Sequence, residues 1–217
     1  MPKLYDIPLK EIRREHMALH SRFIATLAPV FSIDAARAFI TRIKTEFADA
    51  SHNVPAYIIG GGNTLIEYFS DDGEPSGTAG KPALAVLRGS GLGDVAVVIT
   101  RYFGGTLLGT GGLVKAYTEA TQMVVRAVRR GRRVPVYVAL LAIPYPLLER
   151  LRLMVTRHGG EILDEDFAAD ITLTLQFPVE TFTAFQTQLR EISAGKLQAE
   201  VIESKEIVVA QKETNCT

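Results

Sequence analysis

The sequence predicts an α+β protein of two domains, and three observations support this class. The chain has 217 residues, of which 47% are apolar and 22% charged, as in ordinary folded proteins large enough for two small domains. The net charge changes sign near Arg133. Up to that residue there are 17 Lys and Arg and 12 Asp and Glu, and beyond it there are 7 Lys and Arg and 12 Asp and Glu. The apolar pattern changes there too, so we expect domains at 1–132 and 133–217.

A short linker is expected at about 130–135, between the two domains. Gly131 should stop the preceding helix, whose end carries several arginines that suit the negative end of the helix dipole. Pro135 then resists the start of another helical turn.

The first half reads as strands and helices around glycine-rich loops. The β-branched run Val95–Ile99 is typical of a strand buried on both faces, and we expect it at the centre of a sheet. The expected elements are, in order, a strand at 22–28, a helix capped by Ser32, a hairpin of strands 57–59 and 65–69 joined by residues 60–63, the strand at 95–99, and a helix that ends near 127.

The second half has a βαββαβ order. Residues 171–177 alternate apolar and polar side chains, which indicates a strand with one buried face. The expected elements are a strand at 136–143, a helix opened by Pro146, strands at 161–167 and 171–177, a helix around 182–192, and a strand at 201–209. This order is the ferredoxin-like plan, in which two helices cover one face of a four-stranded antiparallel sheet.

A cytoplasmic location without membrane association is expected. Cys216 is the only cysteine, so neither an intramolecular disulfide nor a cysteine-based metal site can form. The first 22 residues are rich in charges and lack the apolar run of a signal peptide. The most apolar segment, Val95–Ile99, is far shorter than the ~20 residues that a membrane-spanning helix needs.

The first of three candidate clusters is an acidic loop. Its candidate ligand-binding residues are Asp71, Asp72, Glu74, Ser76, Thr78 and Lys81. The three carboxylates could hold Mg²⁺ together with waters, but the favoured interpretation is that they cap backbone amides ahead of a helix. A phosphate loop ending at Lys81 is excluded, because prolines stand where that motif requires Gly and Ser or Thr.

The second cluster lies between the strand at 95–99 and the following helix. Its candidate residues are Arg101, Tyr102, Gly104, Gly105, Gly109, Gly111, Gly112 and Lys115. A strand, a glycine loop and a helix in this order aim free amides and the helix dipole at an anion such as phosphate, while Arg101 offers a forked donor and Tyr102 a stacking ring. The alternative is a tight connection in which the glycines only permit close packing and Tyr102 or Phe103 is buried.

The third cluster contains His52 and Tyr57, at the start of an expected strand. His52 could act as a base or a stacking platform, although a hydrogen-bonded loop histidine is the commoner case. The scatter of the other three histidines argues against a histidine metal site. We assign no catalytic residue, no metal ligand and no cofactor, and no nucleophile motif is present.

Taken together, these motifs resemble the IMPACT family, and in particular its bacterial YigZ-like branch. The resemblance rests on Ser51-His52-Asn53, the run from Asp71 to Pro82, the run from Arg101 to Gly105, and the run from Leu108 to Tyr117. One departure is Val54-Pro55, where members of the family often have Cys and Trp. The resemblance implies a first domain folded like domain IV of elongation factor G, a fold shared with the second domain of a small-subunit ribosomal protein, and a second domain like domain V of that factor.

The resemblance also implies a function, since eukaryotic relatives regulate translation under amino-acid starvation by competing for an activator of a starvation-sensing kinase. Our leading hypothesis is a non-enzymatic regulator that binds RNA, the ribosome or a translation-control protein through the first domain. One alternative is a Mg²⁺-assisted enzyme acting on a phosphorylated small molecule, and another is a pure protein-interaction module. The sequence leaves catalysis open and favours a role without it.

Overall fold

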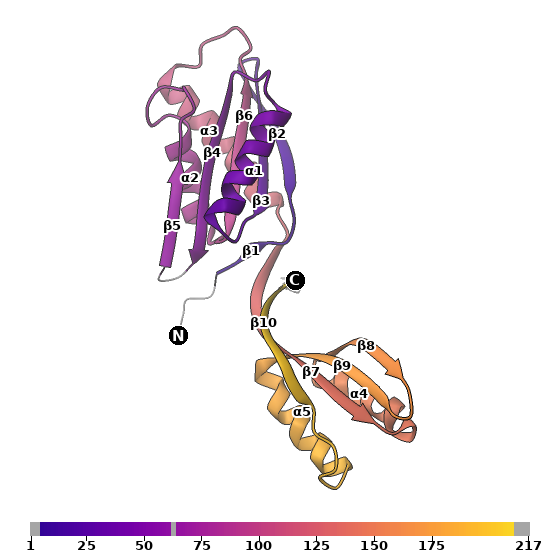
Figure 1. Cartoon of the computed structure of the whole chain (residues 1–217). Helices are drawn as coiled ribbons and strands as arrows, with labels where there is room; N and C mark the ends of the chain where they lie inside the picture. Colours follow the sequence, from indigo (N-terminus) through magenta and orange to yellow (C-terminus); the bar gives the residue numbers. More distant parts are fainter. Residues whose placement is uncertain (1–4, 62–63, 211–217) are drawn as a thin grey trace, which may run out of the picture. The chain divides into compact units, whose positions relative to one another are not determined.

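The computed structural model describes residues 5–61 and 64–210, which form two compact units (Figure 1). The first unit runs to Arg132 and includes Val209 and Ala210; the second comprises Arg133–Val208. Each unit has its own apolar core.

A five-stranded antiparallel sheet forms the centre of the first unit. Its strand order is β2 (Ile12–Ala18), β3 (Ser21–Pro29), β6 (Val95–Tyr102), β4 (His52–Gly61) and β5 (Thr64–Phe69). The central position predicted for Val95–Ile99 is confirmed, because β6 lies third of five and these residues are fully buried. The expected hairpin also forms between β4 and β5, although Gly62 and Asn63 lie outside the described residues.

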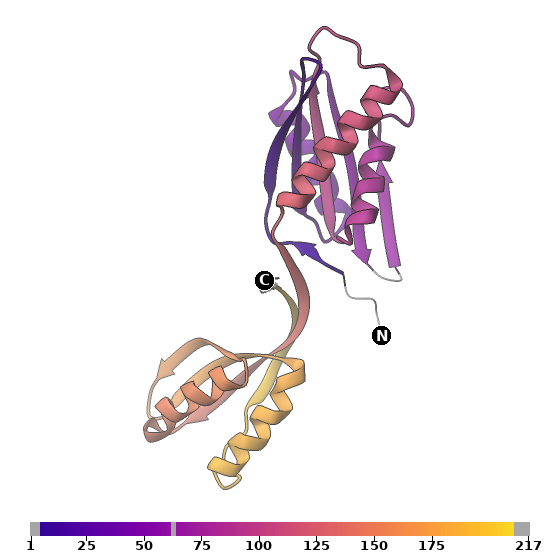
Figure 2. The same ribbon diagram turned by 180° about the vertical axis from the view of Figure 1, so that it is seen from behind.

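Helices cover both faces of this sheet. Figure 1 shows α1 (Ile33–Glu46) on one face, and Figure 2 shows α2 (Gly80–Ser90) and α3 (Gly109–Ala127) side by side on the other. Ser32 caps α1 as predicted, because its side chain accepts a hydrogen bond from the amide of Ala35 at 3.1 Å. Successive β6 residues point alternately to the two cores.

The first unit differs from the expected list of elements in several places, since β1, β2 and α2 were not among them. β2 was not predicted, because its charged sequence lacks a clear apolar run; it is an edge strand whose charges face solvent and pair across the sheet, as in the contact of Glu15 with Arg22 at 2.6 Å. The linker expected at about 130–135 is instead the first part of β7 (Arg130–Ile143). The short strand β1 (Ile7–Pro8) pairs with residues 130–131 there, and Asp6 forms ion pairs with Arg130 and Arg132, so the backbone at 130–132 is held extended.

The second unit has the predicted βαββαβ order. After β7 come the short 3-10 turn η1 (Tyr145–Leu147), α4 (Leu148–Arg157), β8 (Glu161–Phe167), β9 (Ile171–Pro178), α5 (Val179–Ile192) and β10 (Glu200–Ala210). The strand order is β10-β7-β9-β8, and β9 alternates buried and partly exposed residues as its sequence predicted. Side chains of α4 and α5 share one apolar core with the inner face of the sheet.

Candidate functional site

The sequence-predicted clusters meet at one end of the first unit's sheet, which we call the loop end. It comprises residues 19–21, 47–52, 70–79 and 101–112, where β3 and β4 begin and β5 and β6 end (Figure 1). The register places His52 opposite Arg101 and Arg22 opposite Tyr102 on neighbouring strands. Segments far apart in the sequence therefore converge here.

A buried ionic network underlies the loop end. An oxygen of Glu74 accepts hydrogen bonds from Arg101 at 2.7 Å and from the hydroxyl of Tyr117 at 2.8 Å. The side chains of Glu74 and Arg101 are only 3% and 6% exposed. This contact fastens the acidic loop to both β6 and α3. Burial, reinforced by the adjacent Glu74 carboxylate, holds the pKa of Tyr117 far above its usual value, so the hydroxyl keeps its proton and donates.

Arg101 is committed to contacts inside the protein. Its second terminal nitrogen donates to the hydroxyl of Ser21 at 3.3 Å, and its guanidinium lies 5.5 Å from the ring centres of both Phe23 and Phe103. The forked donor that the sequence suggested for phosphate is thus used to build the loop end, and Phe103 lies on it from the solvent side, 46% exposed.

His52 lies beside this network with one ring nitrogen already used. Its Nδ1 is 2.8 Å from the carbonyl oxygen of Asp72, and because a carbonyl only accepts, Nδ1 carries the proton. The other nitrogen, Nε2, lies 3.8 Å from Glu74, and the side chain remains 25% exposed.

The three carboxylates of the acidic loop point to three separate sets of partners. Asp71 accepts hydrogen bonds from the amides of Gly77, Ala79 and Gly80 at 2.8–3.1 Å, which confirms that it caps the start of α2. Asp72 binds the amide of Asn53 at 2.7 Å and the ammonium of Lys44, and Glu74 belongs to the network above. Within the described residues, no group of three His, Cys, Asp or Glu could hold a metal ion. Each of the three carboxylates is thus held by a different partner in this structure.

The start of α3 is open to solvent. Residues 103–107 and 109–111 are exposed, and Leu108 offers no side-chain cap. The amides of residues 109–111 find no acceptor in the described part of the chain, as expected for the first turn of an uncapped helix. The first turn also contains no acidic residue. The positive end of the helix dipole therefore faces water.

The loop glycines are needed for different reasons. A Cβ at Gly104 would lie 2.0 Å from the carbonyl oxygen of His20, so this position permits close packing. Gly105 and Gly109 have φ of +82° and +71°, which other residues rarely adopt. Gly112 is tight against Leu108, at 3.0 Å. Gly111 has neither constraint, because its φ is ordinary and nothing lies within 4 Å of a Cβ there.

The remaining predicted residues are spread over several places. Tyr57 faces the α1 side of the sheet and stacks on Tyr68 with ring centres 5.1 Å apart, and the hydroxyl of Tyr102 donates to Asp49 at 2.8 Å. Thr78 is buried, and its hydroxyl donates a hydrogen bond to the carbonyl of Pro75. The side chains of Ser76, Lys81 and Lys115 are exposed. Ser21 and Phe23 were not predicted as site residues, since no local motif marks them and they reach Arg101 only through the register of β3 and β6.

Fold and site together define a two-unit α+β protein whose first unit presents an open helix start above a buried Glu–Arg–Tyr network. Residues 19–125 match the model of the Impact N-terminal domain, and residues 141–196 match a domain of unknown function, DUF1949. The chain belongs to the IMPACT family. Across the described residues, no helix has both the length and the apolar character needed to cross a membrane.

Several relatives span nearly the whole chain. It is 39% identical to the IMPACT family member YigZ of Escherichia coli, over 84% of this chain and 90% of that protein, and 38% identical to an IMPACT family member of Haemophilus influenzae, over 92% and 97%. Protein IMPACT of Xenopus laevis is 38% identical over 41% of this chain but only 29% of its own length. A crystal structure described as that of a hypothetical protein has a TM-score of 0.62 and 37% identity, and covers 94% of this chain and 98% of its own.

Proposed function

We propose that the chain is a non-enzymatic regulator associated with translation, whose N-terminal domain (1–132) binds single-stranded RNA, free or on the ribosome, at the loop end. Its relationship to vertebrate IMPACT proteins supports the translational context, and we propose a cytoplasmic location to match. We also propose that its two domains share the folds of domains IV and V of elongation factor G, the second domain being 133–217. The capped and paired carboxylates favour binding over metal-assisted catalysis.

The open start of α3 carries this proposal. A helix of 19 residues begins here with three amides that have no partner among the described residues, and such an N-terminus attracts phosphate through both its N–H donors and its dipole. Lys115, exposed in the second turn, adds a positive charge whose carboxylate partner among the described residues is Glu119 of the same helix, at 4.0 Å. A single phosphate of an RNA chain fits this chemistry.

Gly111 supplies an independent reason to expect a ligand. Glycine inside a helix costs about 0.5–1 kcal/mol relative to alanine, and neither packing nor φ requires it at this position. Side chains of a helix tilt toward its N-terminus, so a Cβ at residue 111 would project to where an anion must approach the amides. The lower helix stability that glycine brings at residue 111 is explained if a bound phosphate must come close to the backbone there.

Exposed apolar side chains beside the helix start favour nucleic acid over free phosphate. Phe103 presents its ring to solvent with the guanidinium of Arg101 behind it, and Leu107 is 85% exposed. Stacking of a base on an aromatic ring contributes about 1–3 kcal/mol without regard to sequence. Phosphate at Gly109–Gly111 and a base on Phe103 together describe single-stranded RNA.

The test is a fluorescence-anisotropy titration of a labelled single-stranded RNA with the full chain at two salt concentrations. Binding should weaken by about 0.7 log units per log unit of salt for each phosphate contact. Gly111→Ala should weaken it by about tenfold or more, the worth of one charge-assisted hydrogen bond. Gly89→Ala is the matched control, because Gly89 is another helical glycine with nothing within 4 Å of a Cβ. Absent binding, salt-insensitive binding, or equal effects of the two substitutions would refute the proposal.

A further inference from the structure

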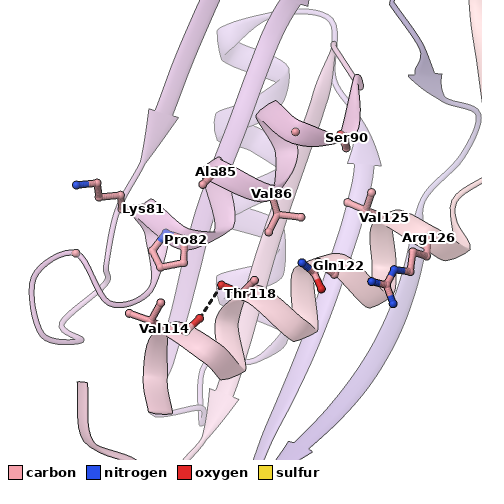
Figure 3. Close-up of a pocket in the computed structure, with 12 residues that line it drawn as sticks. Lys81, Pro82, Ala85, Val86, Ser90, Val114, Thr118, Gln122, Val125 and Arg126 are labelled. Carbon is pink, nitrogen blue, oxygen red and sulfur yellow. Dashed lines mark hydrogen bonds between the residues drawn. The ribbon is translucent and has the colours of Figure 1, made fainter. Parts of the chain in front are cut away.

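A groove runs between α2 and α3 on the outer face of the first unit, and of the loop-end residues defined above, Gly77 alone lines it. It encloses about 720 Å³. Figure 3 shows side chains of both helices pointing into it. The floor is made mainly by Pro82, Ala85, Val86, Val114 and Val125, and Gly89 opens its wall. Nothing in the proposed RNA contact uses this surface.

The two hydroxyl groups that line the groove are already hydrogen-bonded within their own helices, which leaves the floor between them suited to apolar contacts. The hydroxyl of Thr118 donates to the carbonyl of Val114 at 2.7 Å, and that of Ser90 donates to Leu87 at 2.6 Å (Figure 3 shows the first). No aromatic ring lines the groove among the described residues, so a nucleic-acid base has nothing to stack on. An aliphatic side chain is the better occupant.

The ends of the groove are positively charged. Lys81 lies at one end and Arg126 at the other (Figure 3). Neither charged group has a hydrogen bond or ion pair with another described residue, and the described lining contains no Asp or Glu. Many other cations of this unit, such as Arg13, Arg22 and Arg88, pair with carboxylates. Two unpaired cations at the two ends of an apolar floor call for an occupant with a carboxylate at each end.

The dimensions indicate the form of that occupant. Lys81 and Ser90 lie nine residues apart on α2, so the groove is about 14 Å long. A helix of similar length lying along α2 and α3 would place apolar residues at i, i+3, i+4 and i+7 on the floor. A second copy docked through the same groove would bring Lys81 and Arg126 against a surface of the same charge.

We propose that the α2–α3 groove binds a helical segment of a protein partner, whose apolar stripe is flanked at both ends by carboxylates. This site is independent of the loop end, and either can fail without the other. The RNA contact requires the amides of Gly109–Gly111, whereas the groove requires its open floor and the charges of Lys81 and Arg126.

Two labelled helical peptides of about 14 residues test the site with the full chain. Both have leucines at i, i+3, i+4 and i+7; one has a glutamate just outside each end of this stripe, the two about nine residues apart, and the other has lysines there. The glutamate peptide should bind about twofold to thirtyfold more tightly, the worth of two exposed ion pairs. The double variant Lys81→Glu/Arg126→Glu should reverse the preference. Arg150→Glu, an exposed charge on α4 of the second unit, is the control and should change neither affinity.

Filling the groove is the second arm of the test. Gly89→Leu places a side chain in open space on a helix and should leave the circular dichroism spectrum unchanged while abolishing binding of both peptides. Gly111→Ala should leave peptide binding intact. The proposal is overturned if the glutamate peptide does not bind, if charge reversal leaves the preference unchanged, or if Gly89→Leu blocks RNA but not peptide.

Discussion

Removing the carboxylate of Glu74 should destabilise the first unit more than any other single charge deletion discussed above. Glu74→Ala leaves the guanidinium of Arg101, 6% exposed, without its counter-charge and removes the acceptor of the Tyr117 hydroxyl. Breaking a buried ion pair in this way costs about 3–5 kcal/mol, a large part of the ~5–15 kcal/mol by which a domain is stable. Tyr117→Phe removes only one hydrogen bond to the carboxylate and should cost about 1.5–3 kcal/mol.

The assay must report on the first unit alone, because each unit has its own core and the two can unfold separately. Native-state hydrogen exchange of the β6 amides gives the free energy of opening for that unit. Glu67→Ala is the control, since it breaks a more exposed ion pair with Arg88 and should have a much smaller effect. If the β6 amides are as well protected from exchange in the Glu74→Ala variant as in the Glu67→Ala variant, the network does not stabilise the first unit and our reasoning is incorrect.

Three further outcomes are expected. Gly111→Ala should raise the free energy of unfolding of the first unit by about 0.5–1 kcal/mol in the same exchange assay, and a loss of stability would show that glycine is needed there for folding. Asp71→Ala should cost about 0.5–2 kcal/mol and increase exchange in the first turn of α2; unchanged exchange there would contradict the capping role. Because the pKa of Tyr117 is raised in the folded state, its contribution to stability is complete below the unfolded pKa of about 10 and falls above it by about 1.4 kcal/mol per pH unit. Exchange measured between pH 9 and pH 11 should therefore show a steeper loss in the parent than in Tyr117→Phe, and identical slopes would argue against a buried, protonated Tyr117.

Elements were predictable where the pattern of apolar residues along the element itself shows which of its faces are buried. Val95–Ile99 is apolar on both faces because both faces are buried, and residues 171–177 alternate because only one is. β2 was missed for the opposite reason. Its charges are stabilised by partners on β3 and α1, such as Glu46 for Arg13, which no local pattern reveals.

The candidate residues were chosen from local motifs, and those motifs did not reveal the contacts that the residues make in the structure. Arg101 is a plausible phosphate ligand in the sequence, and only the fold brings it to Glu74 and to Ser21, a residue 80 positions away. The glycines of the second cluster look alike in sequence, whereas in the structure Gly104 serves packing and Gly111 does not. These distinctions depend on tertiary neighbours.

The most direct test of RNA binding at the loop end is a titration of the ¹⁵N-labelled chain with single-stranded RNA, followed by the shifts of its backbone amide signals. We expect the largest changes at residues 103–112 of the first unit, with β8 and β9 of the second unit unaffected. The account would be contradicted if the amide signals of residues 109–111 did not shift while those of another surface did. It would also be contradicted if no amide signal shifted at all.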